Sequence, residues 1–347
     1  MKKSLIRRRC AALALAVCLA FPLAGCRSAS SPSQAAEPPV LSDTLRPVPY
    51  RFGVGYSGEG YTEVFTRWRD LVLEDTGGNV ELELFGSNIL GEGKDMLRAV
   101  KRGTLSIMAS STSVHTELVE DAAVMDVPAC FEEYVQPYTV YGGAFFDALN
   151  ACYREKGLEL LYLQTGEPWI IATKHPVEQL SALDHMHLRT SGSLYHDRLY
   201  EAMGMTCVDN VGLAGIPYLL EEGRAEGIET TYAILRSEAL TESLSYALEA
   251  PLFVMSSAVV MNREAWDLLP GEYQEIVRSR LRELLSQRVE AARNGVQLPV
   301  QVRVLTPEDR SLLREIAAPL LEEISRRVGK DLLESLREEN LGSQRRD

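Results

Sequence analysis

The amino-acid sequence predicts an α/β protein built from two successive sets of alternating strands and helices. Short apolar segments of the kind that form strands recur along the chain. Between them lie segments whose apolar residues are three and four apart, as on one face of a helix. Strands and helices that succeed each other in this way favour a parallel sheet with covering helices. We therefore expect α/β lobes.

The first set of elements begins at residue 48. In the helix expected there, Val64, Trp68 and Leu71 share one face, and Gly77 follows its end. The strands are expected at 48–52, 80–85 and 105–109, and the helices at 61–74 and 93–102. Ligand loops of such sheets follow the carboxyl ends of strands. This rule places residues 55–57 and 110–113 at a cleft.

The second set of elements follows a helix expected at 136–156. Its strands are expected at 158–163, 169–173, 186–190 and 206–208, and its helices at 195–203 and from Pro217. Further strands are expected at 258–261 and 300–305, and two helices close the chain. The helical tract at 264–293 is long for a globular helix. A helix that spans two lobes explains this length.

The N-terminal residues resemble a bacterial lipoprotein signal. A positively charged start precedes the apolar stretch 10–23, which is too short for a comfortable membrane span. The stretch ends in Leu23-Ala24-Gly25-Cys26, which is similar to a lipobox. We expect a signal peptide at 1–25, a lipid on Cys26 and a Ser/Ala/Pro-rich tether at 26–47. The alternative is an ordinary secretory signal with an incidental cysteine. Either places the mature protein outside the cytoplasm, in the periplasm or on the outer cell surface.

The charge and the cysteines of the chain restrict which molecules it is expected to bind. The chain has 347 residues, about two domains, and a net charge of −13 that cleavage before Cys26 makes more negative. Such an acidic surface disfavours nucleic acid. The cysteines that remain after Cys26 show no CxxC or metal-ligand spacing. They are Cys130, Cys152 and Cys207. Buried free thiols are the favoured interpretation, with one disulfide as the alternative.

One motif matches a dinucleotide-binding fingerprint but is interpreted otherwise. Gly53, Gly55 and Gly58 have the G-x-G-x-x-G spacing between a strand and a helix. The strand contains Pro49 and Arg51, whereas a buried strand of that fold is almost entirely apolar. An exported protein also has little access to free NAD. We interpret the motif as a Gly-rich turn that brings backbone to a cleft.

Catalytic and metal-binding constellations are weak in this sequence. No Ser/His/Asp set can be assembled, and none of the five histidines belongs to an H-E-x-x-H motif. His185 and His187 would share one strand face and are candidate metal ligands, although solvated or hydrogen-bonded histidines are the favoured interpretation. We therefore expect no enzymatic activity, no catalytic residue, no cofactor and no metal site.

The segment His187–Thr231 resembles the central signature of the solute-binding proteins of TRAP transporters, the DctP family. It combines a strand arginine, Arg189, with a Pro-opened helix and a turn that ends in Glu229-Thr230-Thr231. Further pieces of the family pattern occur in order along residues 50–336. They include the turn at 126–131, the segment 180–189, Gly204–Val208 and the Leu-Pro motif near Trp266. Together these pieces are specific, although each alone is weak.

The resemblance implies a two-lobed, periplasmic-binding-protein-like fold with a long helix spanning both lobes. We assign residues 48–165 plus 258–292 to lobe I and 166–257 plus 293–347 to lobe II. Members of the family capture a small organic acid by lobe closure and deliver it to a membrane permease driven by an ion gradient. The rival hypotheses are a sensing lipoprotein that docks on a membrane sensor protein, and an exported enzyme on a similar scaffold.

The resemblance also implies a ligand site. In the family the arginine holds a ligand carboxylate, a role that suits a planar guanidinium with paired donors. The expected ligand-binding residues are Arg189, Trp169, Glu229, Thr230, Tyr56, Ser111 and Leu213. Trp169 stands where some members carry a second arginine, and Thr230 where asparagine is usual. We therefore hypothesise a monocarboxylate with an apolar or aromatic body that packs on Trp169. The alternative is that Trp169 belongs to the core.

Overall fold

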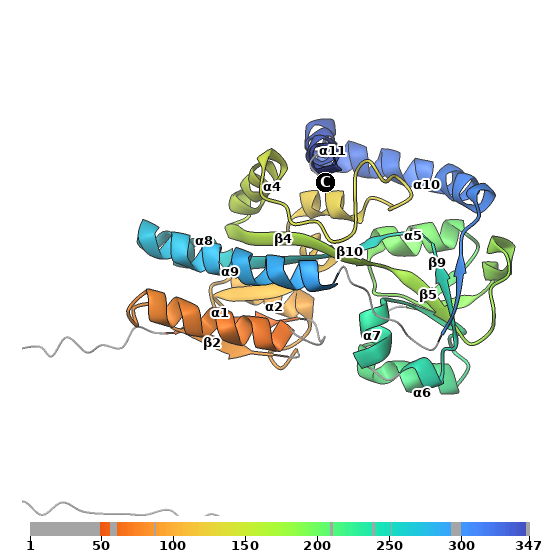
Figure 1. Cartoon of the computed structure of the whole chain (residues 1–347), viewed down its shortest axis with the longest axis horizontal. Helices are drawn as coiled ribbons and strands as arrows, with labels where there is room; N and C mark the ends of the chain where they lie inside the picture. Colours follow the sequence, from red (N-terminus) through yellow and green to blue (C-terminus); the bar gives the residue numbers. More distant parts are fainter. Residues whose placement is uncertain are drawn as a thin grey trace, which may run out of the picture. The chain divides into compact units, whose positions relative to one another are not determined.

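The computed structural model describes residues 49–55, 61–86, 88–208, 211–237, 240–250, 252–292 and 300–344. The expected signal peptide and the lipid-anchor residue Cys26 lie outside these residues, and so does Tyr56. The strands of the described chain form two sheets (Figure 1). Among the described residues, no helix combines the length and the apolar character needed to cross a bilayer.

The first sheet is mixed, with the strand order β2-β1-β3-β10-β4. These strands are β1 (Tyr50–Val54), β2 (Leu82–Phe85), β3 (Ile107–Ser111), β4 (Leu158–Pro168) and β10 (Val254–Asn262). Strand β1 pairs in parallel with β2 and β3, as predicted. Strand β10, whose direction the sequence pattern did not predict, lies antiparallel between β3 and β4. Strand β10 re-enters this sheet from the second one, so it runs in the opposite direction.

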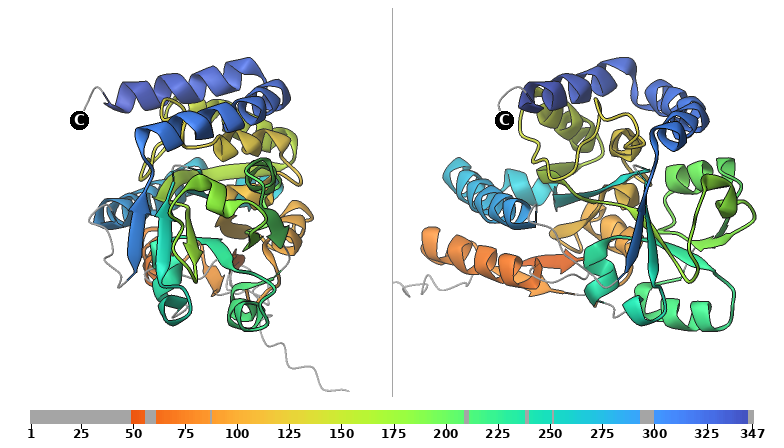
Figure 2. Two further views of the ribbon diagram at one scale, coloured as in Figure 1. Left: turned by 90° about the vertical axis from the view of Figure 1, so that its right-hand side faces the viewer. Right: turned by 45° about the vertical axis from the view of Figure 1, so that its right-hand side comes forward.

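Helices α1 (Tyr61–Asp75) and α9 (Gly271–Ala292) pack side by side along the first sheet (Figure 2). Phe52 of β1 contacts Phe65 and Trp68 edge-on, and the Trp68 indole donates to the Val277 carbonyl at 3.0 Å. The helix expected at 264–293 is two helices, since α8 (Arg263–Asp267) ends before Pro270. The longer one packs on α1 and β4 of the first sheet.

The second sheet has the strand order β11-β9-β5-β8-β6-β7. Its strands are β5 (Ile170–Thr173), β6 (His187–Arg189), β7 (Thr206–Val208), β8 (Gly227–Thr230), β9 (Tyr246–Glu249) and β11 (Gln301–Val304). Strands β6, β7 and β8 are parallel, whereas β5 is antiparallel to β8 and β9. The short elements β9 and α7 (Tyr232–Ser237) were not predicted.

Two crossings between the sheets lie against each other. The chain leaves β4 and enters β5 at Trp169, and it returns from β9 to β10 through Phe253. The Trp169 backbone N–H donates to the Phe253 carbonyl at 2.9 Å, and Pro168 pairs with Val254. The crossings therefore form a continuous hydrogen-bonded ribbon along β4 and β10 (Figure 1).

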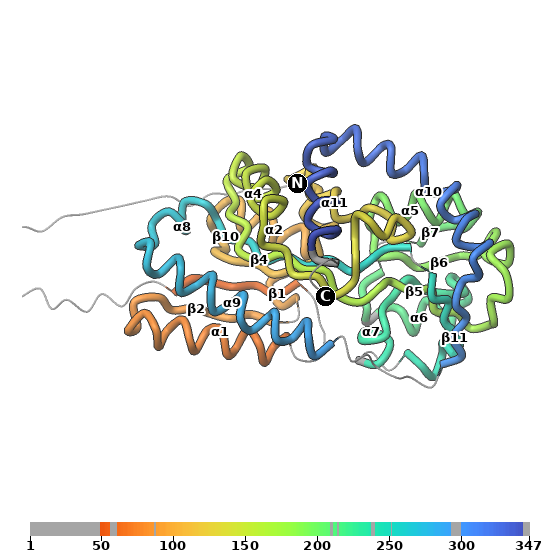
Figure 3. The backbone as a smooth tube through the Cα atoms, turned by 45° about the horizontal axis from the view of Figure 1, so that its top comes forward, coloured from red at the N-terminus to blue at the C-terminus, as the bar shows by residue number. Residues whose placement is uncertain are grey.

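The C-terminal helices contact elements next to both sheets (Figure 3). Helix α10 (Pro307–Val328) packs on α5 (Leu194–Ala202) and on the 3-10 helix η1 (Glu120–Asp126). Helix α11 (Lys330–Gln344) packs on α4 (Ala144–Glu155), and the Glu339 carboxylate accepts from backbone N–H groups at the start of that helix. The final helix, which the sequence division places in lobe II, thus lies against a helix of lobe I. Cys130, Cys152 and Cys207 have free thiols.

Candidate functional site

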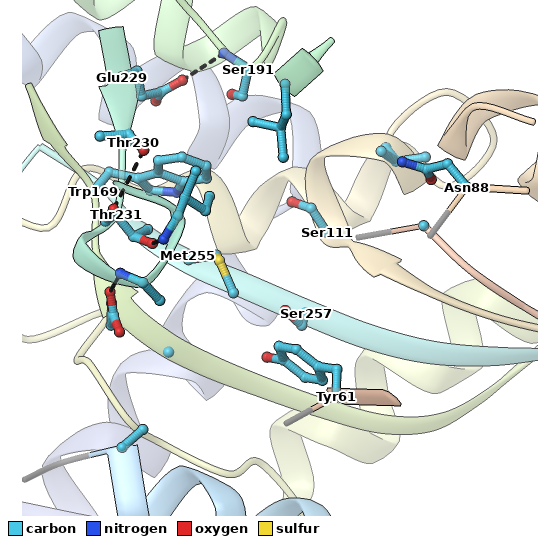
Figure 4. A pocket seen from close by; sticks show the side chains of 18 of the residues that line it. Tyr61, Asn88, Ser111, Trp169, Ser191, Glu229, Thr230, Thr231, Met255 and Ser257 are labelled. Atoms are coloured by element: carbon cyan, nitrogen blue, oxygen red, sulfur yellow. Dashed lines mark hydrogen bonds between the residues drawn. The ribbon is translucent and has the colours of Figure 1, made fainter. Parts of the chain in front are cut away.

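A cavity of about 520 Å³ is lined by residues from elements of both sheets (Figure 4). On the first sheet, Gly55 follows β1 and Ser111 ends β3. On the second sheet, Arg189 ends β6 and Thr230 ends β8. All four positions are carboxyl ends of parallel strands, where α/β folds place ligand sites. The volume lies within the range of about 300–1,000 Å³ that is typical of small-molecule sites.

Strand register brings the expected residues together. Ile170 of β5 lies opposite Thr230 of β8 in an antiparallel pair, so Trp169 is next to the end of β8. Arg189 pairs with Ile228, the neighbour of Glu229, in a parallel pair. Six of the predicted residues line this cavity, namely Arg189, Trp169, Glu229, Thr230, Ser111 and Leu213. The seventh, Tyr56, lies outside the described residues. Their contact with a ligand stays a prediction.

The Arg189 guanidinium is held by the backbone of the following loop. Its Nε and Nη2 atoms donate to the Val211 carbonyl at 3.0 and 2.6 Å. Its Nη1 atom has no hydrogen-bond partner within the described part of the chain. Burial lowers the pKa of Arg189 and the charge of Glu229 opposes this effect, but an arginine remains protonated. The residue therefore presents a fixed positive charge to the cavity.

Glu229 is completely buried and does not hydrogen-bond to Arg189. Its Oε1 accepts from His196 Nδ1 at 2.5 Å and from the Tyr200 hydroxyl at 2.7 Å, while Oε2 accepts from the Ser191 N–H at 2.7 Å. Burial raises the pKa of Glu229, but the charge of His196 and the hydrogen bonds from His196, Tyr200 and Ser191 together outweigh burial and lower it to about 2. The carboxylate stays ionised and orders the loop that follows Arg189.

His196 connects this carboxylate to the crossing segments. The imidazole stacks on Phe253 with ring centroids 3.7 Å apart and meets Trp169 edge-on at 6.0 Å. Its Nε2 lies 3.7 Å from Asp126 Oδ1. Burial lowers the pKa of His196, but the charge and hydrogen bond of Glu229 and the charges of Asp126 and Asp197 together outweigh burial and raise it. Sequence analysis missed this cluster, because its members lie on η1, α5 and β8 and share no motif.

A second polar group lies on the first-sheet side of the cavity and was also missed. The Arg288 guanidinium of α9 lies over the Tyr61 ring, 3.5 Å from its centroid. The Tyr61 hydroxyl accepts from Gln164 Nε2 at 3.2 Å. Ser257 of β10 also lines the cavity, and its Oγ is buried without a hydrogen-bond partner among the described residues. The position of Tyr61 directly after the Gly-rich loop could have predicted its place at the cavity. No feature of the sequence around Arg288 predicts such a place.

The remaining lining is largely apolar, with two further acids. Glu167 Oε2 accepts from the Ala233 N–H at 3.0 Å, at the start of α7. Glu92 is exposed at the start of α2 (Gly93–Lys101). The apolar side chains include Val114, Trp169, Leu213, Ile234 and Met255. The cavity thus combines charged ends with an apolar wall around Trp169, which is 8% exposed and also packs in the core.

Metal and nucleophile arrangements are not found in the described part of the chain. No group of three or more His, Cys, Asp or Glu side chains there has the geometry of a metal site. His187 begins β6, whereas His185 precedes the strand with a φ of 64°, so the two do not share a strand face. Ser110 bonds to His115 at 2.9 Å, but both side chains are completely buried, which denies a substrate access to the hydroxyl.

Comparisons with known proteins agree with this architecture. The C4-dicarboxylate-binding periplasmic protein DctP of Rhodobacter capsulatus is 21% identical over 286 residues, which cover 78% of this chain and 84% of the relative. The ectoine/5-hydroxyectoine-binding periplasmic protein UehA of Ruegeria pomeroyi is 26% identical over 251 residues, which cover 69% and 74%.

Solved structures share the fold. A TRAP periplasmic solute-binding protein from Ralstonia eutropha with bound (S)-2-acetolactate has a TM-score of 0.73 at 17% identity, covering 85% of this chain and 99% of the other. A TRAP protein from Desulfovibrio salexigens with bound orotic acid has a TM-score of 0.71 at 21% identity, with the same coverage. These proteins have two lobes. The two sheets correspond to that mixed α/β architecture, as predicted.

The family assignment rests on a match over most of the chain. The family model for the bacterial extracellular solute-binding proteins of family 7, DctP, matches residues 57–327. The matched range contains the second sheet, the first sheet except β1, and every cavity-lining residue except Gly55. The chain therefore belongs to family 7 of the bacterial extracellular solute-binding proteins, the family that its sequence motifs resemble.

Proposed function

We propose that this protein captures a small organic acid outside the cytoplasm and delivers it to a TRAP membrane permease. The observation that carries the proposal is the Arg189 guanidinium, which is fixed by the Val211 carbonyl at the edge of a cavity lined from both sheets. A buried guanidinium binds a carboxylate through short, charge-assisted hydrogen bonds. The family membership supports the role of a transport receptor without catalytic activity.

The orientation of Arg189 restricts how the carboxylate binds. Nε and Nη2 already donate along one edge to Val211, so the ligand takes the other edge, through Nη1 and the remaining hydrogen of Nη2. The body of the ligand then packs on the apolar wall around Trp169. Thr230, Ser111, Leu213 and Tyr56 complete the proposed ligand contacts.

Capture proceeds by closure of the two lobes, 48–165 plus 258–292 and 166–257 plus 293–347, around the ligand. The paired crossings at Trp169 and Phe253 serve as the hinge. A ligand shifts the equilibrium toward the closed state only if it binds that state more tightly, which requires contacts with both lobes. Closure also removes water from the Arg–carboxylate pair and strengthens its Coulomb attraction.

Ligand identification tests this function. Mass spectrometry of ligand released from the natively purified protein is expected to find an organic acid. The same acid is expected to raise the melting temperature with concentration, because stabilisation grows as RT ln(1 + [L]/Kd). A neutral sugar as the only stabilising ligand, or turnover of the bound acid, contradicts the proposal. Loss of uptake on deletion distinguishes a transport receptor from a sensor.

We further propose that Cys26 carries a lipid that tethers the mature protein to a bacterial membrane. The Leu23-Ala24-Gly25-Cys26 sequence supports this proposal. Cys26→Ser is expected to move the protein from the detergent-rich to the aqueous phase in phase partitioning. Cys130→Ser, which changes a cysteine of the folded part, is the control and keeps the wild-type distribution. Equal partitioning of wild type and Cys26→Ser argues against the anchor.

A further inference from the structure

The cavity has a polar end that the predicted Arg189 site does not include. Arg288, Tyr61 and Ser257 come from α9, α1 and β10, three elements of the first sheet and its covering helices. Figure 4 places Tyr61 and Ser257 on the side away from Ser191 and Glu229, next to which Arg189 lies. The two arginines therefore belong to different ends of one cavity.

The group around Arg288 is held in place by packing. Tyr61 is 4% exposed, stacks on Phe65 and accepts a hydrogen bond from Gln164. Gln164 lies opposite Ser257 in the antiparallel pair of β4 and β10, so the two side chains are on the same face of the sheet. The guanidinium carbon of Arg288 lies over the Tyr61 ring, where cation–π attraction positions this group.

Ser257 provides an independent sign of a ligand contact. The residue is 3% exposed, and its Oγ has no hydrogen-bond partner among the described residues. A buried hydroxyl without a partner is unfavourable, so a ligand oxygen that accepts from it gains binding free energy. A carboxylate suits this position best, since it accepts from a hydroxyl and carries the charge opposite to Arg288.

We propose that Arg288, Tyr61 and Ser257 form a second oxyanion subsite, so that the ligand is an organic acid with a second carboxylate at the end remote from Arg189. This inference rests on the proposed function of Arg189. It replaces the hypothesis of a monocarboxylate, and it keeps the apolar wall around Trp169 for the middle of the ligand. The cavity volume of about 520 Å³ leaves room for a small organic acid with two carboxylates.

Glu167 and Glu92 also line the cavity, and their negative charge opposes the binding of a second carboxylate. Glu167 accepts from the Ala233 N–H, and Glu92 is exposed to solvent, which weakens its field. If these acids decided the specificity, the remote end of the ligand would be cationic. Three six-carbon probes separate the cases, because they share one carboxylate and differ at the other end: adipate, hexanoate and 6-aminohexanoate.

Calorimetry with the three probes on the wild-type protein is the first measurement. Adipate is expected to bind about 10- to 100-fold more tightly than hexanoate, the gain typical of a charged hydrogen-bonded contact. 6-Aminohexanoate is expected to bind most weakly. Equal affinities of adipate and hexanoate, or tightest binding of 6-aminohexanoate, overturn the second subsite while the role of Arg189 stands. Failure of every probe, with a non-acid found in the native protein, overturns the proposed function as well.

Variants assign the effect to the subsite. Arg288→Gln is expected to remove the preference for adipate and leave hexanoate affinity within about twofold of wild type. Arg282→Gln changes an exposed arginine on the same helix that does not line the cavity, and it is expected to change neither affinity. Ser257→Ala removes the hydroxyl donor of the subsite, and it tests the same preference for adipate if Arg288→Gln does not fold. A parallel loss of both affinities in Arg288→Gln, or a retained preference in both variants, contradicts the proposal.

Discussion

Arg189→Ala is expected to abolish high-affinity binding of the organic acid, at a cost of about 2–5 kcal/mol, or roughly 30- to 5,000-fold in Kd. Arg189 is 9% exposed, so a ligand carboxylate beside it is buried and loses its counter-charge in the variant. Arg189→Lys is expected to bind with intermediate affinity, since lysine keeps the charge but lacks the planar pair of donors. Isothermal titration calorimetry of the variants measures both effects.

Unfolding of the ligand-free protein controls for structural damage by this substitution. Arg189 also donates two hydrogen bonds to the Val211 carbonyl, so some stability is lost with it. Arg189→Lys and Arg189→Ala are therefore compared at a temperature at which both are folded, as judged by circular dichroism. Near-wild-type affinity of folded Arg189→Ala would show that another residue anchors the carboxylate.

His196→Leu is expected to lower the free energy of unfolding by about 3–5 kcal/mol, since it leaves the completely buried Glu229 carboxylate without its cationic partner. Chemical denaturation measures the loss.

The stability difference between His196→Leu and wild type is expected to depend on pH. The native pKa of Glu229 is below its ordinary value of 4.5, so its stabilisation is present above pH 4.5 and is lost as pH falls toward 2. The raised pKa of His196 gives stabilisation that is complete below 6.5 and is lost at higher pH. The difference from wild type is therefore expected to be largest between about pH 4.5 and 6.5.

His115→Leu is the matched control for this prediction. His115 is also completely buried, but it bonds to the Ser110 and Tyr153 hydroxyls, and burial lowers its pKa to about 3. The wild-type protein then loses stability as pH falls below 6.5, because the unfolded chain takes up the proton first. The difference between His115→Leu and wild type should thus shrink on acidification, whereas that of His196→Leu should not shrink above pH 4.5. The same pH trend in both variants would refute a charged His196–Glu229 pair.

The parts of the fold with local signals were predicted well. Alternating apolar residues and Gly-ended helices predicted β1, α1, β2, α2 and β3 and their parallel pairing. The break between α8 and α9 was missed although Pro270 was visible, because periodic apolar spacing continues on both sides of it. The antiparallel position of β10 depends on where the chain re-enters the first sheet, and no local pattern encodes that path.

The candidate site likewise contains residues that local sequence signals predicted and residues that they did not. Arg189, Glu229 and Thr230 lie at the carboxyl ends of short strands with recognisable motifs, so their meeting at one edge was predictable. Tyr61 and Arg288 are more than two hundred residues apart, and only the packing of α1 on α9 brings them into contact. His196 and Tyr200 of α5 both hydrogen-bond to Glu229 of β8, and a histidine within a helix gives no sign of such a partner.

The crossing at Trp169 has a practical consequence for measurement. The chain contains three tryptophans, and of these Trp169 alone lines the cavity, whereas Trp68 and Trp266 are buried in the core under the first sheet. Its indole therefore senses both the occupant of the cavity and the geometry of the segment that joins the sheets. Intrinsic fluorescence of the unlabelled protein is thus expected to report ligand binding and the proposed lobe closure from a single residue, against a constant background from the other two.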